Sequence, residues 1–474
     1  MHKPSDCDFG MIGLGVMGRN FLLNIADNGY RVIGYDLDRQ RVNALKEGHT
    51  GGEVSASADL EEFLAALKAP KRVMLLVPAG VAVDKVIESI LTKLKPGDII
   101  IDGGNSHYYD TNRRASYLAD TGIHFLGMGV SGGEKGARSG PSLMPGGSRE
   151  AYLVVKDMLE DVSAKVNGEA CVSYLGKGAA GHYVKMVHNG IEYGIMQLIA
   201  EIYDVLRRLG GLNEDELAHT FTSWNEGPLR SFLVEITADI FHQADDQKEG
   251  EMLINNILDS AKQKGTGKWT SQSALDLGVA IPSIDNAVSM RYLSSLKDER
   301  TQADKLLKGP RPGIFLGDRE QLVRQAHDAL HFAMLLTYAQ GFALLKKASE
   351  EMGFGLNMKE VARIWRGGCI IRAAMLDDFM KVFSSQTGIA NLILNKDIAK
   401  LLDQVNEGAR AVVGHCVQQG LAASTLSATL SYYDTYRSSR LPSNLIQAQR
   451  DYFGAHTYER LDKTGAFHTI WGVS

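Results

Sequence analysis

About the first 180 residues alternate short apolar runs with stretches of helical periodicity. Such alternation is typical of an α/β layer structure with a mostly parallel sheet. Several of the apolar runs are followed at once by glycine-rich or polar turns. The predicted strands are Phe9–Ile12, Arg31–Tyr35, Val73–Val77, Ile99–Asp102 and His124–Met128.

From about residue 181 onward, long amphipathic segments such as Ile191–Leu209 and Ala329–Met352 dominate, and strand signals almost vanish. This second region is predicted to be all-helical. The end of the chain is rich in turn formers, aromatic and basic residues, and it is too apolar for a solvated disordered arm. We expect it to lie along another surface, such as that of a second subunit. The predicted division is 1–180, 181–436 and a C-terminal tail, 437–474.

A polar arc is predicted early in the second region, in the segment VKMVHNGIEYG. At about 100° per residue, Lys185, His188, Asn189, Glu192 and Tyr193 would share one side of a helix. A lysine and a carboxylate two turns apart would then face the same space. An ordinary helix ion pair is the alternative, but favourable pairs are three or four residues apart and these two are seven apart.

The second region also contains a predicted repeat. Residues 196–218 and 339–362 share apolar spacing, a glutamine, a terminal glycine and a following Gly-Leu-Asn. Chance similarity between two amphipathic helices is the alternative explanation. At the offset of the two glutamines, 143 residues, Lys185 and Glu192 have no counterpart, whereas His188 does. A packing requirement would recur in both copies, so this difference favours a function for the lysine and the glutamate.

The composition is that of an ordinary globular chain: of 474 residues, 44% are hydrophobic and 23% are charged. This length exceeds what one hydrophobic core normally supports, which favours two or more domains. The formal net charge of −5 gives no reason to expect nucleic acid or an acidic membrane as a partner. The N-terminus does not resemble a signal peptide, and no apolar stretch approaches about 20 residues. We therefore expect a cytoplasmic protein.

The cysteines lie far apart and form no metal-binding or redox spacing, which suits a reducing compartment. We expect a free, buried thiol at each of them, and the sequence contains no cluster of metal ligands. The four are Cys7, Cys171, Cys369 and Cys416.

A dinucleotide site is predicted where Gly13-x-Gly15-x-x-Gly18 stands between an apolar strand and a helix. Gly13 permits the tight turn, Gly15 lets the backbone approach a pyrophosphate, and Gly18 lets the helix pack closely on the sheet. The N-terminus of that helix offers unpaired N–H groups to the anion. Asp36 ends the second strand 18 residues after the last glycine, close to the expected spacing of about 20. The alternative is an incidental glycine turn.

The residue at the end of the second strand also bears on which dinucleotide is bound. The carboxylate of Asp36 can accept hydrogen bonds from both ribose hydroxyls and repels a 2′-phosphate, whereas NADP sites usually offer arginine. Basic charge appears only at Arg39 and Arg41. NAD is therefore predicted as the preferred coenzyme. In the alternative, Asp36 only caps a turn and the arginines reach a 2′-phosphate, which would favour NADP.

Two polar segments follow predicted strands and so should lie as loops at the carboxyl end of the sheet, where open α/β sheets bind ligands. They are residues 102–115 and 127–148. In the second, Ser131-Gly132-Gly133 can direct backbone N–H groups and a hydroxyl toward a carboxylate. Such a glycine loop can also be a plain turn.

Six motifs carry a resemblance over nearly the whole chain, in order. They are GLGVMGRN, DGGNS, GVSGGEKGARSGPSLMPGG, GHYVKMVHNGIEYG, QKGTGKWT and RDYFGAHTYERLD. Together they resemble the decarboxylating 6-phosphogluconate dehydrogenase family, within the β-hydroxyacid dehydrogenase superfamily. The resemblance implies a Rossmann-type N-terminal domain, a duplicated all-helical domain, and a tail inserted into the partner of a homodimer. It also implies oxidation of 6-phosphogluconate at C3, followed by loss of CO2 to give ribulose 5-phosphate in the pentose phosphate pathway.

The resemblance further implies a role for individual residues, each taken from a matching motif. Lys185 and Glu192 would be the catalytic pair, without a metal. The substrate would contact Asn105, Ser131, Gly132, Gly133, His188, Asn189, Tyr193, Lys264 and Arg291, with Arg450 and His456 supplied by the other subunit. The coenzyme would contact Gly13, Gly15, Val16, Met17, Gly18, Asp36, Val77, Ala79 and Asn105.

Two departures from the family pattern affect only the coenzyme half of the site. NADP-dependent members carry Asn-Arg-Thr or similar where this chain has Asp36-Leu37-Asp38, and commonly Lys-Ala-Gly where it has Pro78-Ala79-Gly80. Two other functions remain open on the sequence. One is an NAD-dependent β-hydroxyacid dehydrogenase for a small acid without phosphate, and the other is a non-catalytic dinucleotide-binding protein.

Overall fold

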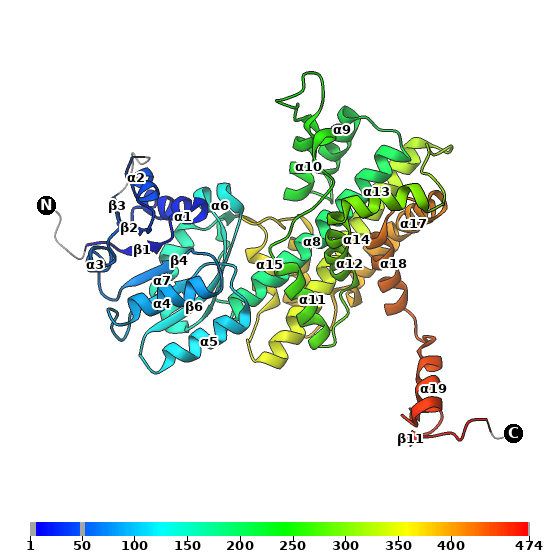
Figure 1. Cartoon of the computed structure of the whole chain (residues 1–474). Helices are drawn as coiled ribbons and strands as arrows, with labels where there is room; N and C mark the ends of the chain where they lie inside the picture. Colours follow the sequence, from blue (N-terminus) through cyan, green and yellow to red (C-terminus); the bar gives the residue numbers. More distant parts are fainter. Residues whose placement is uncertain (1–5, 48–52, 473–474) are drawn as a thin grey trace.

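The computed structural model describes residues 6–47 and 53–472, in which a sheet with covering helices precedes a large helical region (Figure 1). The sheet has the strand order β3-β2-β1-β4-β5-β6-β7. The neighbours from β3 to β6 are parallel, and β7 pairs antiparallel with β6, so the prediction of a mostly parallel sheet is confirmed. The strands are β1 (Phe9–Ile12), β2 (Val32–Tyr35), β3 (Val54–Ser57), β4 (Arg72–Leu75), β5 (Ile99–Asp102), β6 (His124–Ser131) and β7 (Ser142–Gly147).

Five strands coincide with the apolar runs of the sequence. β1 and β5 have the predicted bounds, β2 begins one residue late, and β6 continues to Ser131. β4 ends before Val77, because Val77 already lies in the bend that follows the strand. β3 and β7 were not predicted. The glycines and proline of SLMPGG indicated a loop, but pairing with β6 along its whole length makes this segment a strand.

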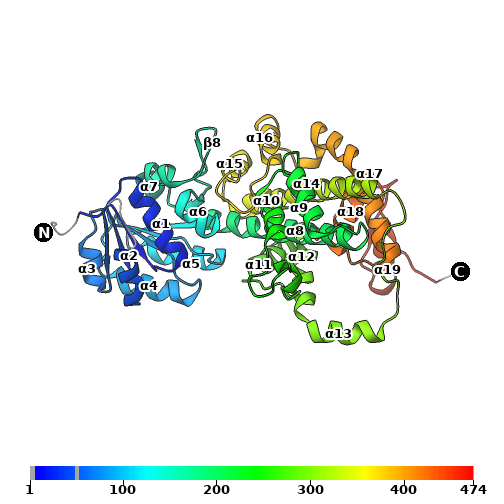
Figure 2. The same ribbon diagram turned by 90° about the horizontal axis from the view of Figure 1, so that it is seen from above.

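Helices cover both faces of the sheet (Figure 2). One apolar core joins the sheet to α1, α2, α6 and α7, and a second joins the opposite face to α3, α4 and α5. The prediction of loops throughout 102–115 and 127–148 is wrong, since α5, β6, α6 and β7 occupy much of them. The helices are α1 (Val16–Asp27), α2 (Arg39–Glu47), α3 (Leu60–Ala65), α4 (Val81–Leu91), α5 (Tyr108–Ala119), α6 (Gly133–Ser139) and α7 (Arg149–Val162), followed by the short hairpin β8 (Lys165–Val166) and β9 (Glu169–Ala170).

The helical region is built around two long helices, α8 (Ala180–Arg208) and α14 (Arg319–Met352). They approach closely where Gly341 faces Ile191 and Gly194 faces Thr337, because a Cβ on either glycine would lie about 2.5 Å from its neighbour. Every element within residues 181–436, all of which the structure describes, is helical, as predicted. The others are α9 (Glu214–Trp224), α10 (Phe232–His242), η1 (Leu253–Asn256), α11 (Thr266–Asp276), α12 (Pro282–Ser295), α13 (Lys297–Leu306), α15 (Met358–Ile364), α16 (Met375–Ser385), η2 (Leu392–Leu394), α17 (Lys396–Gln419) and α18 (Ser424–Tyr436).

The predicted repeat corresponds to two helix–turn–helix units of the same construction. Gly211 follows α8 and Gly355 follows α14, both with positive φ, at 66° and 73°. Asn213 then caps α9 and Asn357 caps α15, each by accepting a hydrogen bond from the backbone of the first helical turn. The shared Gly-Leu-Asn of the sequence therefore encodes a helix ending and a helix start.

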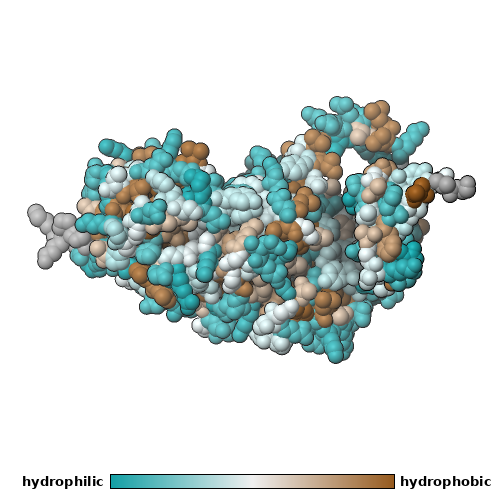
Figure 3. Space-filling model, turned by 90° about the horizontal axis from the view of Figure 1, so that it is seen from below, coloured by the Kyte–Doolittle hydropathy of each residue, from teal (hydrophilic) through white to brown (hydrophobic). Residues whose placement is uncertain are grey.

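The C-terminal tail carries α19 (Ser443–Gly454), β10 (Tyr458–Glu459) and β11 (Ala466–Phe467), and it extends away from the helical region (Figure 1). Asp451 is fully buried within it. Its carboxylate accepts hydrogen bonds from the backbone of Thr457 and Thr469 and from the indole of Trp471, at 2.8–3.1 Å. Hydrophobic atoms stay exposed near the end of the tail (Figure 3). The tail is thus ordered by its own contacts and leaves apolar surface uncovered.

No helix among the described residues is both long enough and apolar enough to span a bilayer. The four cysteines are free; three are buried as expected, whereas Cys7 is half-buried.

Candidate active site

The polar arc predicted from the sequence lies on α8, on the side that faces the carboxyl end of β6. Lys185 is 7% exposed, His188 is fully buried, and Tyr193 is buried against α11 and α12. Gly129 on β6 makes room for the lysine, because a Cβ there would lie 2.4 Å from the Cβ of Lys185. His188 Nδ1 lies 3.9 Å from Glu192 Oε2, so the arc faces one space as predicted.

Burial shifts the pKa values of the two ionisable groups of the arc, Lys185 and Glu192, in opposite directions. It lowers the pKa of Lys185, although the nearby carboxyl group of Glu192 acts the other way. It raises the pKa of Glu192, although Lys185 and Arg291 act to lower it. Both shifts favour a neutral amine and a protonated carboxyl group, which is the opposite of a stable ion pair. These are the protonation states of a general base and a general acid.

His188 connects the helix to the loop that ends β6. Its Nε2 lies 3.1 Å from Ser131 Oγ, and its Nδ1 lies 3.0 Å from Asn189 Oδ1. Burial holds the pKa of His188 well below its ordinary value, so the ring is a neutral hydrogen-bonding group. Gly132 and Gly133 have positive φ, and the space beside Gly133 is open. A small anion could therefore reach the backbone N–H groups of this turn.

The helices α11 and α12 supply the far end of the site. The side-chain amide of Asn189 donates to Thr266 Oγ1 at 3.2 Å. Gly267 lies against the ring of Tyr193, and the guanidinium of Arg291 lies over the same ring, 3.5 Å from its centroid. Burial lowers the pKa of Arg291, whose charge nevertheless remains. A phosphate beside this tyrosine would meet a fixed positive charge.

Some predicted residues are exposed, and some site residues were missed. Lys264 is exposed before α11, and Asn105 is exposed after β5. Arg450 and His456 are exposed on the tail, apart from α8 (Figure 1). Thr266 was not among the predicted site residues, although the motif QKGTGKWT contains it. Trp365, whose ring lies 5.7 Å from that of His188 between centroids, and Cys369, near Lys185, were not predicted either, because neither residue stands in a motif that pointed to the site.

The predicted coenzyme residues lie at the carboxyl ends of β1, β2, β4 and β5. Gly13 has φ of 99°, and a Cβ on Gly18 would lie 1.9 Å from the carbonyl oxygen of Gly13. Both positions therefore require glycine. The space beside Gly15 is open. Val16 and Met17 begin α1, whose first N–H groups have no side-chain cap. This is the arrangement that holds a pyrophosphate.

The carboxylate of Asp36 is partly used within the protein. It accepts hydrogen bonds from the backbone N–H groups of Leu14 (2.8 Å) and Asp38 (2.9 Å), and Arg41 Nη1 lies 3.3 Å away. The turn-capping role that the sequence left open is therefore present. Oδ2 accepts from both Leu14 and Arg41, whereas Oδ1 accepts only from Asp38 and keeps a second lone pair, to which a ribose hydroxyl could still donate.

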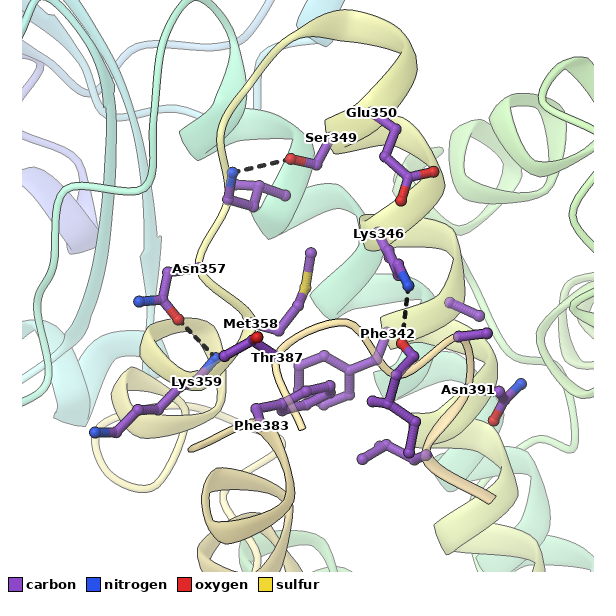
Figure 4. Close-up of a pocket in the computed structure, with 15 residues that line it drawn as sticks. Phe342, Lys346, Ser349, Glu350, Asn357, Met358, Lys359, Phe383, Thr387 and Asn391 are labelled. Atoms are coloured by element: carbon purple, nitrogen blue, oxygen red, sulfur yellow. Dashed lines mark hydrogen bonds between the residues drawn. The ribbon is translucent and has the colours of Figure 1, made fainter. Parts of the chain in front are cut away.

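Within residues 6–47 and 53–472, no group of three or more His, Cys, Asp or Glu side chains is placed to hold a metal ion. A pocket of about 400 Å³ lies in the helical region between α14, α15 and α16 (Figure 4). Two of its polar side chains are paired inside the protein: Lys346 Nζ donates to the carbonyl of Gly388, and Ser349 Oγ accepts from the backbone of Leu356. None of the predicted site residues lines it.

Two family models match most of the chain. Residues 8–176 match a family model described as the NAD binding domain of 6-phosphogluconate dehydrogenase, and residues 181–471 match one described as its C-terminal domain. The chain is 49% identical to the decarboxylating 6-phosphogluconate dehydrogenase of Lactococcus lactis subsp. lactis over 469 residues, which is 98% of this chain and 99% of the relative. It is 49% identical to the NADP(+)-dependent, decarboxylating enzyme of Bacillus subtilis, covering 98% of each chain.

A solved structure gives the same result for the fold. The 6-phosphogluconate dehydrogenase of Plasmodium falciparum, described in its apo form and in complex with NADP+ and with 6-phosphogluconate, superposes with a TM-score of 0.93. The two sequences are 42% identical, and the match covers 98% of this chain and 100% of the other.

Proposed function

This chain belongs to the 6-phosphogluconate dehydrogenase family, and on that premise we propose that it oxidises 6-phosphogluconate, reduces NAD(P)+ and releases CO2 to form ribulose 5-phosphate. The single observation that carries the proposal is the pair on α8 formed by the buried Lys185 and the partly buried Glu192. Lys185 and Glu192 have pKa shifts that favour a neutral base and a protonated acid. Coenzyme binding alone would require neither residue.

Oxidation of the substrate needs a base at the C3 hydroxyl. We assign this role to Lys185, because a neutral amine can accept the hydroxyl proton as the C–H hydride leaves. The coenzyme, when bound, supplies the acceptor for that hydride at C4 of its nicotinamide. The lysine becomes an ammonium in this step, and burial keeps the new charge close to the substrate oxygen.

Decarboxylation follows from the position of the new carbonyl, which is β to the carboxylate. CO2 leaves, and the electrons of the broken bond move toward the C3 oxygen. The ammonium of Lys185 is placed to return its proton to that developing enolate oxygen. The resulting enediol requires a proton at C1, and the protonated carboxyl group of Glu192 is the donor that the site offers. As C1 takes this proton, the enediol hydroxyl at the former C3 gives its own proton back to Lys185, and the ketone product forms. One proton then passes from the ammonium of Lys185 to the carboxylate of Glu192, which restores the neutral amine and the protonated acid.

The remaining residues are proposed to hold the substrate at one end or the other. The Ser131-Gly132-Gly133 turn suits the C1 carboxylate, and Asn105, His188 and Asn189 suit the sugar hydroxyls. The phosphate would bind near Tyr193, Lys264 and Arg291, and also near Arg450 and His456 of a second copy of the chain.

We propose that two copies exchange their tails, with the division 1–180, 181–436 and 437–474. Two observations support this. The tail is ordered around Asp451 yet extends away from its own helical region (Figure 1). It also exposes Leu445, Ile446 and Phe453, each by 60% or more, as a segment that packs on another surface would.

Mixing two inactive or weakened variants tests the exchange. Chains with Arg450→Ala should show a KM for 6-phosphogluconate raised about tenfold or more, since one charge-assisted contact to the phosphate is lost. Arg440→Ala, in the same tail, is the matched control and should leave this KM unchanged.

Chains with Lys185→Ala should be inactive. When the Lys185→Ala and Arg450→Ala proteins are dissociated and reassociated together, about a quarter of the parent sites should reappear at low substrate concentration. No gain over the separate proteins would contradict tail exchange.

For the coenzyme, we propose a preference for NAD over NADP. The preference is supported by the carboxylate that follows β2, since Asp36 would repel a 2′-phosphate and already accepts a hydrogen bond from Arg41. We expect Asp36→Ala to raise the ratio of kcat/KM for NADP to that for NAD by about tenfold, because a like charge is removed. Glu88→Ala is the control, since this carboxylate is exposed on α4 of the same domain. The ratio cancels any general loosening of the Gly13–Gly18 turn that Asp36 supports. An unchanged ratio would count against this role.

The function itself is tested by offering the protein 6-phosphogluconate with each coenzyme and following the absorbance of the reduced nicotinamide. Release of CO2 should match coenzyme reduction. Reduction with a small β-hydroxy acid that lacks phosphate, but not with 6-phosphogluconate, would replace the proposal by the small-acid dehydrogenase. Coenzyme binding without any reduction would indicate a non-catalytic protein.

A further inference from the structure

A buried arginine on α5 joins three separate segments at the coenzyme edge of the sheet. Arg114 is 1% exposed, and all three guanidinium nitrogens are hydrogen-bonded. Nε donates to Asp84 Oδ1 at 2.8 Å, and Nη2 donates to the carbonyl oxygen of Gly80 at 2.9 Å. Nη1 donates to Asp102 Oδ2 at 3.2 Å and to Ser106 Oγ at 3.1 Å.

These contacts fall on the two loops that carry predicted ligand-binding residues. Gly80 ends the loop after β4, which contains Val77 and Ala79. Asp102 ends β5, and its other oxygen accepts a hydrogen bond from the backbone of Gly104, next to Asn105. One planar group therefore spans the gap between neighbouring loops at the carboxyl edge, where an open α/β sheet binds its ligand.

The same cluster reaches the catalytic helix. His182 lies one turn before Lys185 on α8, and its Nε2 donates to the carbonyl oxygen of Asp102 at 3.0 Å. Its Nδ1 lies 2.7 Å from Thr111 Oγ1, on the same helix as the arginine. Burial lowers the pKa of His182, consistent with a neutral ring that donates from one nitrogen and accepts at the other.

Stability alone is a poor explanation for this cluster. A buried ion pair is often no more stabilising than apolar residues of the same volume, because both charges lose their hydration. What a guanidinium provides instead is a rigid fork whose donors point in fixed directions. Here those directions lead to α4, to the loop after β4 and to the loop after β5.

We propose that Arg114 is a positioning residue of the coenzyme site, which sets the separation of the two loops and their alignment with α8. The inference rests on coenzyme binding and not on the identity of the acid substrate. Its loss should let the loops drift apart and weaken the affinity for both coenzymes, since Arg114 bonds to the backbone carbonyl of Gly80 and to the Asp102 carboxylate, and neither group is assigned a contact to a 2′-phosphate.

The neighbouring arginine provides a matched control. Arg113 Nη2 also contacts Asp84, at 2.9 Å from both oxygens, but its side chain is 56% exposed and its other contact is with Asp110 on its own helix. Arg114→Lys keeps the charge and loses the fork. We expect it to raise the dissociation constants of NADH and NADPH about tenfold, measured by coenzyme fluorescence without substrate, whereas Arg113→Lys should match the parent.

Steady-state kinetics separate positioning from simple damage. With Arg114→Lys, the KM for the coenzyme should rise about tenfold while kcat at saturation changes less than about threefold. A lower kcat with unchanged coenzyme KM and affinity would indicate only a reduced fraction of folded protein and would overturn the proposal. Equal coenzyme affinity in the Arg114→Lys, Arg113→Lys and parent proteins would overturn it as well.

A milder variant covers the case in which Arg114→Lys does not fold. Ser106 Oγ donates to Asp102 Oδ2 at 2.6 Å and accepts from the arginine, so Ser106→Ala removes one link and keeps the charges. Coenzyme affinity weakened about threefold would support the proposal, and unchanged affinity would overturn it. Because the binding assay needs no acid substrate, a protein that binds coenzyme but does not oxidise 6-phosphogluconate would contradict the proposed function and leave this result intact.

Discussion

Replacing Lys185 with methionine is expected to lower kcat by about three orders of magnitude, because the site would lose both the base for the C3 hydroxyl and the donor to the enolate oxygen. Methionine has a similar length and suits the buried position, so the packing of α8 against β6 should persist. The measurement is kcat with 6-phosphogluconate, together with the thermal unfolding temperature and the affinity for reduced coenzyme.

Lys268→Met is the matched control for this experiment. Lys268 is an exposed lysine on α11, close in sequence to Thr266 of the site but without an assigned contact to substrate. It should keep the activity of the parent. Turnover near that of the parent in the Lys185→Met protein would remove the proposed role of the lysine.

Glu192→Gln is expected to lower kcat by about two orders of magnitude. The amide keeps the size of the side chain and can still donate a hydrogen bond, but it cannot release a proton to C1 of the enediol. The control is Asp204→Asn, further along the same helix, where the carboxylate pairs with Arg208 at the helix surface. Full activity in the Glu192→Gln protein would show that the proton reaches C1 from another donor.

The pH dependence of kcat/KM should change in the same variant. In the parent, activity should rise as Lys185 loses its proton and fall as Glu192 loses its own, because the amine must be neutral and the carboxyl protonated. Burial favours both of these forms, and the apparent pKa values belong to the pair together with the nearby Arg291. With glutamine at position 192, the fall at high pH should disappear while the rise remains. A profile that keeps its alkaline limb would assign that limb to another group.

Much of the architecture could be read from local patterns. The strand bounds of β1 and β5, the glycine turn before α1 and the side of α8 on which Lys185 and Glu192 lie all follow from residues near one another in the chain. The repeated Gly-Leu-Asn likewise predicts the end of one helix and the N-cap of the next, since both depend on a few consecutive residues. Backbone preferences and apolar periodicity were sufficient for these predictions.

Other features depend on residues far apart in the sequence. β7 is a strand because β6 pairs with it, although its own residues favour a loop. Thr266 joins the site only because α11 packs beside Asn189, and Arg114 is significant only because Gly80 and Asp102 come together around it.

The sequence by itself determined the two-part fold, the coenzyme fingerprint and the pair of reactive groups on one helix, because each is encoded by spacing within a short segment. Only the tertiary structure decided that Lys185 and Glu192 are buried enough for their pKa values to shift toward a base and an acid. Burial is a property of everything that surrounds a side chain, and those surroundings come from β6, α11, α12 and the loop after α15, which no local pattern on α8 can specify.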